Sequence, residues 1–492
     1  MANYLIISLF ILLSSSSQTW GGKVDESSSL CIIGSGIGGS SVAHFIRRYA
    51  SSSSDAIGII RIFERHDIVG GRMATVSIAG DTFEAGASIL HPKNYHAVDY
   101  VNFLNLTVKK PSSSSFGIWD GDKFIFRTLE SSGFWILDQV ISLVDSVQML
   151  WRYGFSLFRM NNFIEITVNK FLKYYESCES RPVFETVDEM LKWAGLYNLT
   201  SRILQEELIN ARLSPALIDE LVTVITKINY GQSVNISGLA GAVSLAGSGE
   251  GLWAIEGGNW QMAAGLIRSS DVTLHLSEEI ESVSDFGDYY ELNSTQGNSY
   301  KCEVTVVATP LDEINLLFTP KPWVLPERKL QHTHATFVRG LLDPAYFGVK
   351  AASGIPELVG TIETPDLPFT SISVLKEHTE SDKTYKIFSR ATLTDTLLGN
   401  LFSTRTETIR IDWAAYPQYE APERFAPIIL DGKHLYYVNA FENAASTMET
   451  SAVSAENVAR LILSRKFGKT KSSLKSSTDP TTSCTNVLHS DL

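Results

Sequence analysis

The stretch "CIIGSGIGGSSVAHFIRR", Cys31 to Arg48, decides the fold of this 492-residue chain. Gly34, Gly36 and Gly39 follow the spacing G-x-G-x-x-G between an apolar run and a helix-like segment. In such a turn the first glycine permits a tight bend, the second lets a pyrophosphate approach the backbone, and the third lets the helix pack on the strand. The unpaired N–H groups at the start of the helix favour an anion. The stretch therefore predicts a Rossmann-type α/β domain that binds a dinucleotide.

A carboxylate stands at the end of the next predicted strand, "GIIRIFE", where the last residue is Glu64. At this place a carboxylate accepts hydrogen bonds from both ribose hydroxyls of an adenosine and repels a 2′-phosphate. We therefore expect Glu64 to bind ribose, which disfavours NADP. A solvated strand end is the alternative interpretation of this residue.

Two glycine-rich segments that follow favour FAD over NAD. "ERHDIVGGRMAT" contains Gly70, Gly71 and Arg72 and resembles the loop that continues along the pyrophosphate in the amine-oxidase superfamily. A guanidinium here suits phosphate or flavin oxygens, and a surface charge is the alternative. "LWAIEGGNWQM", with Gly257 and Gly258, resembles the mid-chain glycine pair that contacts the cofactor in that superfamily.

The C-terminal segment "YYVNAFENAASTMETSAVSAENVA" resembles the last strand and the flavin-facing helix of the same superfamily. The resemblance places Glu442 near the pyrophosphate or ribityl chain, and Met448 and Glu449 at a helix N-terminus that points at the flavin N1–C2=O edge. A helix dipole stabilises the negative charge that develops there. The chain has Ala440 where the family usually has glycine, which puts one backbone contact in doubt; an Ala-rich core helix is the alternative for the helix itself.

Across about residues 28 to 465, the chain most closely resembles the prenylcysteine oxidase family in its plant form. The resemblance rests on the glycine turn with its helix, on "LWAIEGGNWQM", on the part "ENAASTMETSAVSAENVA" of the C-terminal segment, and on "FEAGASILHPKN" and "LINARLSPALIDELVTVITKINYGQ". It implies that FAD oxidises the carbon next to sulfur in an S-prenylcysteine, and that water addition then releases a prenyl aldehyde and free cysteine. Oxygen accepts the electrons and becomes hydrogen peroxide. The plant-type resemblance leans toward a farnesyl tail, and the reaction belongs to the breakdown of prenylated proteins.

The expected site consists of FAD-binding residues and one catalytic candidate, with no metal. His91 in "GASILHPKN" is the candidate for a base that activates water, because this segment is expected to run beside the flavin. A structural histidine before Pro92 is the alternative, and Tyr230 and Glu256 are weaker candidates. The expected cofactor-binding residues are Gly34, Gly36, Gly38, Gly39, Glu64, Arg65, Gly71, Arg72, Ile280, Glu442, Met448 and Glu449.

The expected fold class is α/β, with a Rossmann-type FAD-binding domain of the amine-oxidase and GDI-like superfamily and an interleaved α+β substrate domain. The apolar stretch from about Phe134 to Phe171 is expected to be helical and to wall a tunnel for the prenyl tail, or else to pack in the core. The expected boundaries are a signal peptide at 1–19, an FAD-binding domain at 28–110, 235–325 and 431–465, a substrate domain at 111–234 and 326–430, and a disordered tail at 466–492.

Several features point to the secretory pathway, with the lysosome or vacuole as destination. The N-terminal apolar run is as long as a signal-peptide h-region and too short to span a bilayer, although a mobile apolar tail is the alternative. Asn105, Asn198, Asn235 and Asn293 begin N-glycosylation sequons; burial is expected to leave some unused, Asn235 for example. Cys31 is expected to be a small buried hydrophobe, because a chain of this length does not need a disulfide scaffold.

The partners expected are a small-molecule substrate and oxygen. The formal net charge of −13 argues against nucleic acid, which requires a basic surface. No segment after the leader has the uninterrupted apolar length of a transmembrane helix, so peripheral membrane contact is the membrane interaction left open. The oligomeric state is not determined by the sequence.

Two other functions share the expected fold. One is a different flavin amine oxidase or desaturase; covalent attachment of FAD is disfavoured because Cys484 lies beyond the flavin helix. The other is a non-catalytic prenyl-binding protein like the Rab escort and GDP-dissociation-inhibitor proteins. The predicted signal peptide, the sequons and the intact Glu64 argue against this cytosolic carrier.

Overall fold

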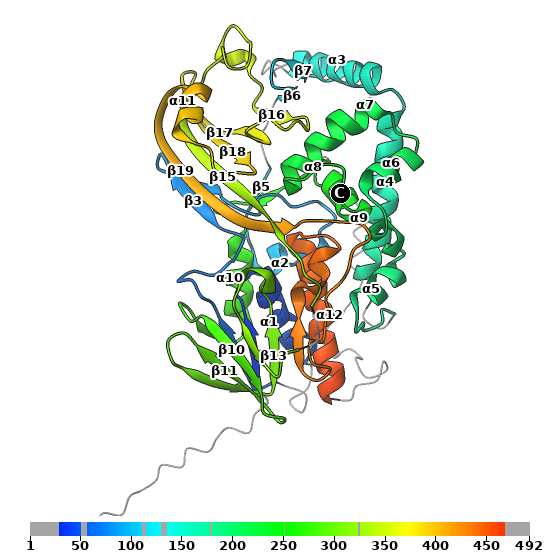
Figure 1. The fold of residues 1–492 in the computed structure, drawn as a ribbon, viewed down its shortest axis with the longest axis vertical. Coiled ribbons are helices and arrows are strands. Elements are labelled where there is room, and N and C mark those ends of the chain that lie inside the picture. Colours follow the sequence, from blue (N-terminus) through cyan, green and yellow to red (C-terminus); the bar gives the residue numbers. More distant parts are fainter. Residues whose placement is uncertain are drawn as a thin grey trace, which may run out of the picture.

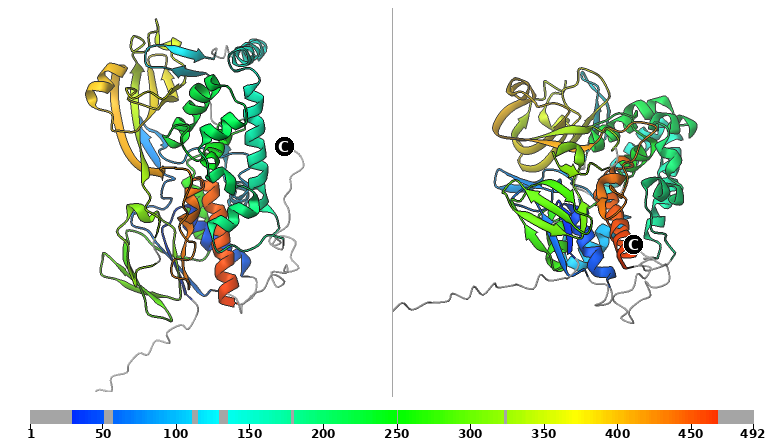
Figure 2. Two further views of the ribbon diagram at one scale, coloured as in Figure 1. Left: turned by 45° about the vertical axis from the view of Figure 1, so that its right-hand side comes forward. Right: turned by 60° about the horizontal axis from the view of Figure 1, so that its bottom comes forward.

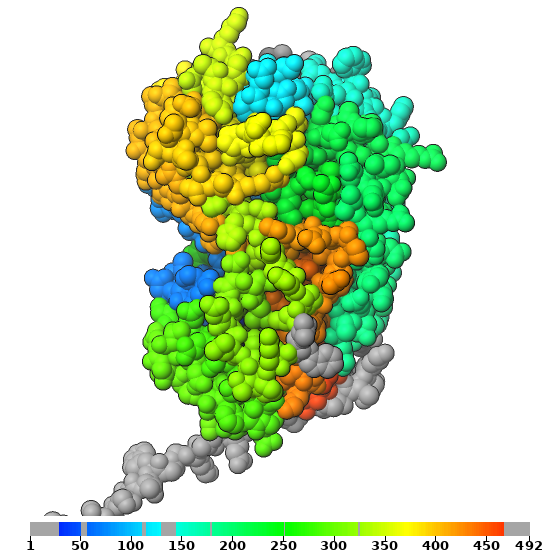
Figure 3. Space-filling view, viewed as in Figure 1, coloured from blue at the N-terminus to red at the C-terminus, as the bar shows by residue number. Residues whose placement is uncertain are grey.

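The computed structural model describes residues 29–50, 57–110, 115–128, 135–177, 180–249, 251–322 and 325–467. The predicted signal peptide and nearly all of the predicted tail lie outside these residues. A nucleotide-binding half and a second half, built from a large sheet and a group of helices, lie one above the other (Figure 1). In the space-filling view the molecule is indented on one side, where the two halves meet (Figure 3).

The nucleotide-binding half is built on a five-stranded parallel sheet, as the glycine turn predicts. Its strand order is β20-β13-β1-β2-β9. The apolar sequence "SLCII" of the central strand is buried almost throughout, which suits a strand covered on both faces. The bounds are β1 (Ser29–Ile33), β2 (Ile59–Phe63), β9 (Thr273–His275), β13 (Val304–Val307) and β20 (Leu435–Tyr437).

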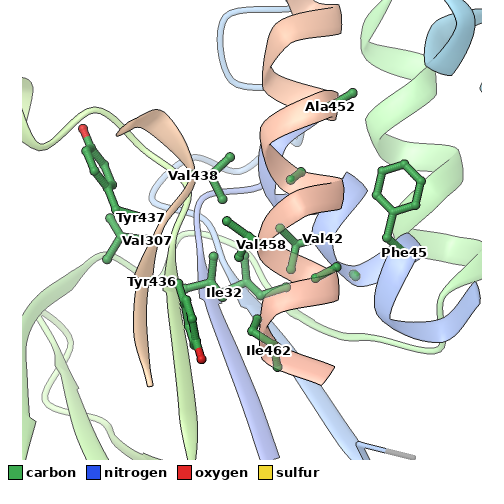
Figure 4. Packing of buried hydrophobic residues seen from close by; sticks show 14 of the residues in the cluster. Ile32, Val42, Phe45, Val307, Tyr436, Tyr437, Val438, Ala452, Val458 and Ile462 are labelled. Atoms are coloured by element: carbon green, nitrogen blue, oxygen red, sulfur yellow. The ribbon is translucent and has the colours of Figure 1, made fainter. Parts of the chain in front are cut away.

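Helices from distant parts of the sequence cover this sheet. Helices α1 (Ile37–Tyr49) and α12 (Met448–Phe467) pack against each other, and α1 also contacts α10 (Trp260–Ser269). Their buried residues form one core with the strands, in which Ile32, Val42 and Val458 lie close together (Figure 4). Helix α2 (Tyr95–Leu104) packs on α10 and α12.

A disulfide joins the central strand to a smaller sheet, which corrects the expectation that Cys31 is an unbonded buried hydrophobe. Cys31 and Cys302 are bonded, with 5.8 Å between their Cα atoms. Strand β1 pairs with β13, and the register places Leu30 opposite Val304. Because β12 ends at Cys302, just before β13 begins, this pairing brings Cys302 beside β1. The smaller sheet has the order β12-β11-β10-β14, with bounds β10 (Ile280–Asp285), β11 (Tyr290–Ser294), β12 (Ser299–Cys302) and β14 (Leu317–Thr319).

The second half contains a seven-stranded sheet of order β19-β15-β18-β17-β16-β6-β7. All neighbours are antiparallel except β16 and β6. The sheet combines strands from both segments of the predicted substrate domain. Their bounds are β6 (Phe116–Trp119), β7 (Phe124–Arg127), β15 (Leu330–Leu342), β16 (Leu358–Thr361), β17 (Ser371–Thr379), β18 (Asp382–Ser389) and β19 (Phe402–Pro417).

A group of helices lies beside this sheet (Figure 2). Helix α9 contacts α4, α6 and α8, so the beginning of the segment 235–325 lies with the substrate-side helices. The bounds are α3 (Trp135–Tyr153), α4 (Ser156–Phe171), α5 (Val187–Ala194), α6 (Leu204–Asn210), α7 (Pro215–Leu217), α8 (Thr223–Tyr230) and α9 (Gly238–Ala246). In the described residues, none of the helices has the length and hydropathy needed to cross a bilayer.

The apolar helical stretch that the sequence predicts consists of two helices in its described part, and part of it faces solvent. Gly154, with φ of +58°, separates α3 from α4. Such a backbone conformation costs glycine little, which explains the break. We call the exposed side chains around the break the α3–α4 apolar surface; they are Val144, Val147, Leu150, Trp151, Phe155 and Phe158, with Trp151 89% exposed. The C-terminal part of α4 does line a cavity, described below.

Candidate active site

The three glycines of the turn are required for different reasons. A Cβ on Gly34, whose φ is +108°, would lie 2.7 Å from the carbonyl oxygen of Ala308. A Cβ on Gly39 would lie 2.0 Å from the oxygen of Gly34, so helix and strand pack too closely for a side chain. A Cβ on Gly36 would meet nothing of the protein closer than 3.7 Å. Gly36 therefore leaves open space beside the helix, which is where a pyrophosphate approaches the backbone.

The N-terminus of α1 offers its amides to an anion. Its N-cap, Gly36, makes no side-chain capping bond, and the first turn has no acidic residue. The second glycine loop lies against this turn, since the N–H of Gly70 donates to the oxygen of Ser35 at 3.3 Å. A Cβ on Gly71 would come within 3.4 Å of the Cα of Gly36. The predicted residues Gly36 and Gly71 are thus brought together at one helix end.

Glu64 is held by the turn itself. Its Oε2 accepts hydrogen bonds from the N–H of Ser35 at 3.1 Å and from the Ser35 hydroxyl at 2.5 Å. Its Oε1 accepts one from the N–H of His66 at 3.0 Å. Glu64 is 6% exposed as a residue, and its carboxylate keeps lone pairs for further donors. This geometry positions an acceptor next to the glycine turn, as ribose binding requires.

Arg72 and Glu442, both expected near the pyrophosphate, contact each other. Arg72 Nη1 lies 2.5 Å from Glu442 Oε1 and donates to the oxygen of Ala415 at 2.6 Å. Burial by itself would raise the pKa of Glu442, but Arg72 and Arg328 outweigh it and hold that pKa below its ordinary value. Arg328, which the sequence analysis did not identify, lies 3.3 Å from Glu442 Oε2. No local sequence pattern marks Arg328, because its partners come from elsewhere in the chain.

The start of α12 faces a cavity, but the Glu449 side chain is directed to a neighbouring helix. Its carboxylate accepts hydrogen bonds from the N–H groups of His96 and Ala97, at 2.8 and 3.0 Å, and from the hydroxyl of Tyr175 at 2.6 Å. It therefore stabilises the N-terminus of α2. The segment 446–450, which includes Met448, lines the cavity.

The other expected cofactor residues have different surroundings. Gly38 lies in the first turn of α1, where a Cβ would be 3.2 Å from a methyl group of Val438. Arg65 is exposed, and its Nε donates to the ring of His66. Ile280 is 5% exposed at the start of β10 and packs in the core.

A cavity of about 540 Å³ lies between the two halves of the molecule. Its lining includes the segment 83–94, parts of α4, α8 and α9, strands β17 and β18, and the start of α12. This volume is within the range of small-molecule sites. The walls from α4 and α9 are mostly apolar and include Val168, Phe171, Leu239, Ala242 and Val243.

Of the three catalytic candidates, the structure places His91 and Tyr230 in the cavity wall. His91 lines the cavity, and its Nδ1 accepts the N–H of Lys93 at 3.0 Å. In the neutral ring Nε2 then carries the proton, so this hydrogen bond favours a donor over the expected base. Burial, assisted by Lys93, lowers the pKa of His91 and so favours the neutral ring.

Of the two weaker candidates, Tyr230 lines the cavity and Glu256 does not. The Tyr230 hydroxyl donates to the oxygen of Ser446 at 3.2 Å, and burial raises its pKa. Glu256 is exposed and is not part of the cavity wall.

Sequence reasoning missed two charged residues in the cavity, Glu84 and Lys386. Lys386 stands in the apolar strand segment "TYKIFS" of β18 and is 8% exposed. A single lysine within a buried strand is unusual, and this is the signal that could have identified it.

These residues fit FAD. Gly36 leaves the space that a pyrophosphate needs, Glu64 supplies the ribose acceptor, and the start of α12 offers a helix dipole to a flavin ring in the cavity. Glu442 and Arg72 would lie between these two ends, as an ion pair at the second glycine loop.

Comparisons with known proteins agree with this arrangement. Residues 136–475 match the family model described as prenylcysteine lyase, and residues 32–104 match an NAD(P)-binding Rossmann-like domain. The chain is 62% identical over 98% of its length to farnesylcysteine lyase of Arabidopsis thaliana, covering 96% of that protein. It is 34% identical to human prenylcysteine oxidase 1, over 90% of each chain.

Solved structures share the fold at low sequence identity. Putrescine oxidase has a TM-score of 0.59 at 13% identity, covering 89% of this chain and 99% of the other. Cyclohexylamine oxidase from Brevibacterium oxydans has a TM-score of 0.57 at 15% identity, with the same coverage. These similarities confirm the expected fold class.

Proposed function

The chain belongs to the prenylcysteine lyase family, and from this premise we propose that it is an FAD-dependent oxidase of S-prenylcysteine, with farnesylcysteine as the preferred substrate. The thioether, oxygen and water give a prenyl aldehyde, cysteine and hydrogen peroxide. The C–S bond breaks after the carbon next to sulfur has lost two electrons, which oxygen finally accepts. The names of the two curated relatives support this substrate class.

The observation that carries the proposal is the cavity, which joins the start of α12 to the apolar walls of α4 and α9. Bound FAD would supply the acceptor for a hydride from the carbon next to sulfur. The chain orients that carbon by holding the prenyl tail between apolar side chains such as Phe171 and Leu239. The same side chains exclude water from the tail, and each buried CH₂ contributes about 0.8 kcal/mol to binding. His91 can donate a hydrogen bond through Nε2 in its neutral form.

Product analysis tests the proposal. The purified protein is expected to be yellow, with flavin absorbance at about 450 nm. It is also expected to release farnesal, cysteine and hydrogen peroxide from farnesylcysteine in equal amounts. A colourless protein that binds farnesylcysteine without turnover would instead indicate a carrier. Turnover of a polyamine in place of farnesylcysteine would indicate an amine oxidase.

We further propose that the protein acts in the secretory pathway, in the lysosome or vacuole. The Cys31–Cys302 disulfide supports an oxidising route. The sequon residues Asn105, Asn198 and Asn235 are exposed, including the one expected to be buried. Asn293 is half-buried, and its amide donates to Ser282. Glycosidase treatment of the protein from its own tissue should therefore report glycans at the first three positions, and an unglycosylated cytosolic protein would refute the proposal.

We also propose that the α3–α4 apolar surface touches a membrane peripherally. Its side chains follow the helical spacing 144, 147, 151 on α3 and continue at Phe155 and Phe158. Helix α3 lies at the end of the molecule opposite to β11 (Figure 1), so a flat surface can reach it. Helix α4 continues from this surface to the cavity wall, which suits a substrate with a lipid tail.

A further inference from the structure

Lys386 is a buried cation in the cavity whose contacts are with neutral groups. Its Nζ donates to the hydroxyl of Ser88 at 3.2 Å and to the main-chain carbonyl oxygen of Glu84 at 3.4 Å. It also lies 4.9 Å from the ring centroid of Phe388. The ion pairs found among the described residues, with N···O distances up to 4.0 Å, include none to Lys386. Burial lowers the pKa of Lys386 to about 8.

Glu84 is the acidic group that acts electrostatically on Lys386. Its Oε1 accepts the N–H of Asn259 at 2.6 Å, whereas Oε2 is buried without a hydrogen-bond partner in the described part of the chain. Burial raises the pKa of Glu84 to about 7. Both residues line the same cavity, so an acid and a base with unused bonding capacity stand at one site.

A buried charged or polar group without a partner is costly, and a ligand that pairs with both groups removes that cost. An S-prenylcysteine has two charges, an α-carboxylate and an α-ammonium, at the end opposite to its apolar tail. We propose that Lys386 binds the carboxylate and Glu84 the ammonium of the amino-acid head group. This assignment rests on the proposed function and names the residues that recognise the cysteine moiety.

The other lysines of the cavity wall are less suited to this role. Lys109 and Lys110 are exposed, and the ammonium groups of exposed lysines keep their water. Lys93 is half-buried in the segment that carries His91. Lys386 alone, among the described lysines of the wall, is both buried and on a strand, which holds its position firmly.

Three compounds that differ in the head group test the assignment. They are farnesylcysteine, S-farnesylcysteamine, which lacks the carboxylate, and S-farnesyl-3-mercaptopropionate, which lacks the ammonium. Lys386→Met is expected to lower kcat/KM for farnesylcysteine about 30-fold or more, mainly through KM, and to leave S-farnesylcysteamine unchanged. Lys386→Arg should restore part of the loss. Glu84→Gln should affect the two ammonium compounds and spare the mercaptopropionate.

The controls separate this assignment from folding and from the proposed function. Lys383→Met removes a lysine of the same strand that pairs with Glu377 and should leave all three compounds unaffected. Flavin absorbance of every variant checks that cofactor and fold are retained. An equal loss for all three compounds in Lys386→Met would overturn the assignment. If the wild-type protein shows no turnover, the oxidase proposal alone is refuted. Equilibrium binding of the same three compounds to wild type and variants still tests the head-group assignment in that case.

Discussion

Arg72 and Glu442, which lie near opposite ends of the sequence, form an ion pair with Nη1 and Oε1 2.5 Å apart. The Glu442 side chain is 3% exposed and that of Arg72 30% exposed. The pair connects the second glycine loop to the segment that precedes α12. It therefore joins the two regions that must enclose a bound dinucleotide.

Breaking this pair is expected to destabilise the protein. Arg72→Gln should lower the free energy of unfolding by about 1–3 kcal/mol, less than for an isolated buried pair because Arg328 still faces Glu442. Denaturant unfolding of Arg72→Gln, Glu442→Gln and the double variant should show non-additive losses. Arg65→Gln, at an exposed position, is the control; strict additivity would show that the two residues act independently.

Two glycine substitutions in one turn should have different effects. Gly36→Ala has space for its Cβ, so the protein should fold but bind FAD at least about 10-fold more weakly, because the methyl group occupies the pyrophosphate side. Gly39→Ala would place a Cβ 2.0 Å from a carbonyl oxygen and should reduce soluble, folded protein. Circular dichroism and flavin content distinguish the two outcomes. Normal FAD content in Gly36→Ala would contradict the assigned cradle.

Removing the Glu64 carboxylate should weaken FAD binding. Glu64→Ala deletes the ribose acceptor and leaves the N–H of Ser35 without its partner, a loss of about 1.5–3 kcal/mol or roughly 10- to 100-fold in affinity. The measurement is flavin retention after gel filtration and titration of the apoprotein with FAD. Asp67→Ala, an exposed acid in the following loop, should keep full occupancy. Full occupancy in Glu64→Ala would remove the ribose assignment.

Glu84 should make stability depend on pH. Its pKa is about 7 in the folded protein against an ordinary value of 4.5, because burial outweighs the hydrogen bond from Asn259 and the charges of Lys386 and Lys109. Between these two values the folded state keeps a proton that the unfolded state releases, so this contribution to stability is present below pH 4.5 and is lost as the pH rises to 7. Glu84→Gln should remove up to about 3 kcal/mol of that loss. Denaturant unfolding at pH 5 and pH 7.5 measures it; identical pH slopes in both proteins would contradict the prediction.

The α3–α4 apolar surface should bind lipid vesicles. Replacing Trp151, Phe155 and Phe158 by serine removes three exposed large side chains and should abolish most co-sedimentation with phosphatidylcholine vesicles. Flavin content should be unchanged, because the residues of α4 that line the cavity, such as Val168 and Phe171, lie at the other end of that helix. Phe286→Ser with Leu317→Ser, which are exposed on the smaller sheet, is the matched control. Equal sedimentation of all three proteins would refute membrane contact.

The nucleotide-binding features could be predicted from the sequence because each depends on neighbours in the chain. The glycine turn, the following helix and the acid at the end of β2 form a short continuous unit, and their spacing determines their positions. The long helical stretch expected from Phe134 onward is divided at Gly154, where one residue with positive φ redirects the chain. The sequence predicts that this stretch lines the tunnel for the prenyl tail. Its composition does not distinguish an apolar face that is buried from one that is exposed to solvent.

What the sequence by itself determined is the FAD-type turn with its acid, the α/β fold class and the family. Only the tertiary structure decided that Cys31 is bonded to Cys302, that Arg72 and Arg328 converge on Glu442, and that Lys386 and Glu84 share a cavity. The physical reason is that local patterns report the conformation of the backbone, whereas the partners of buried charges and thiols are set by how distant strands and helices pack.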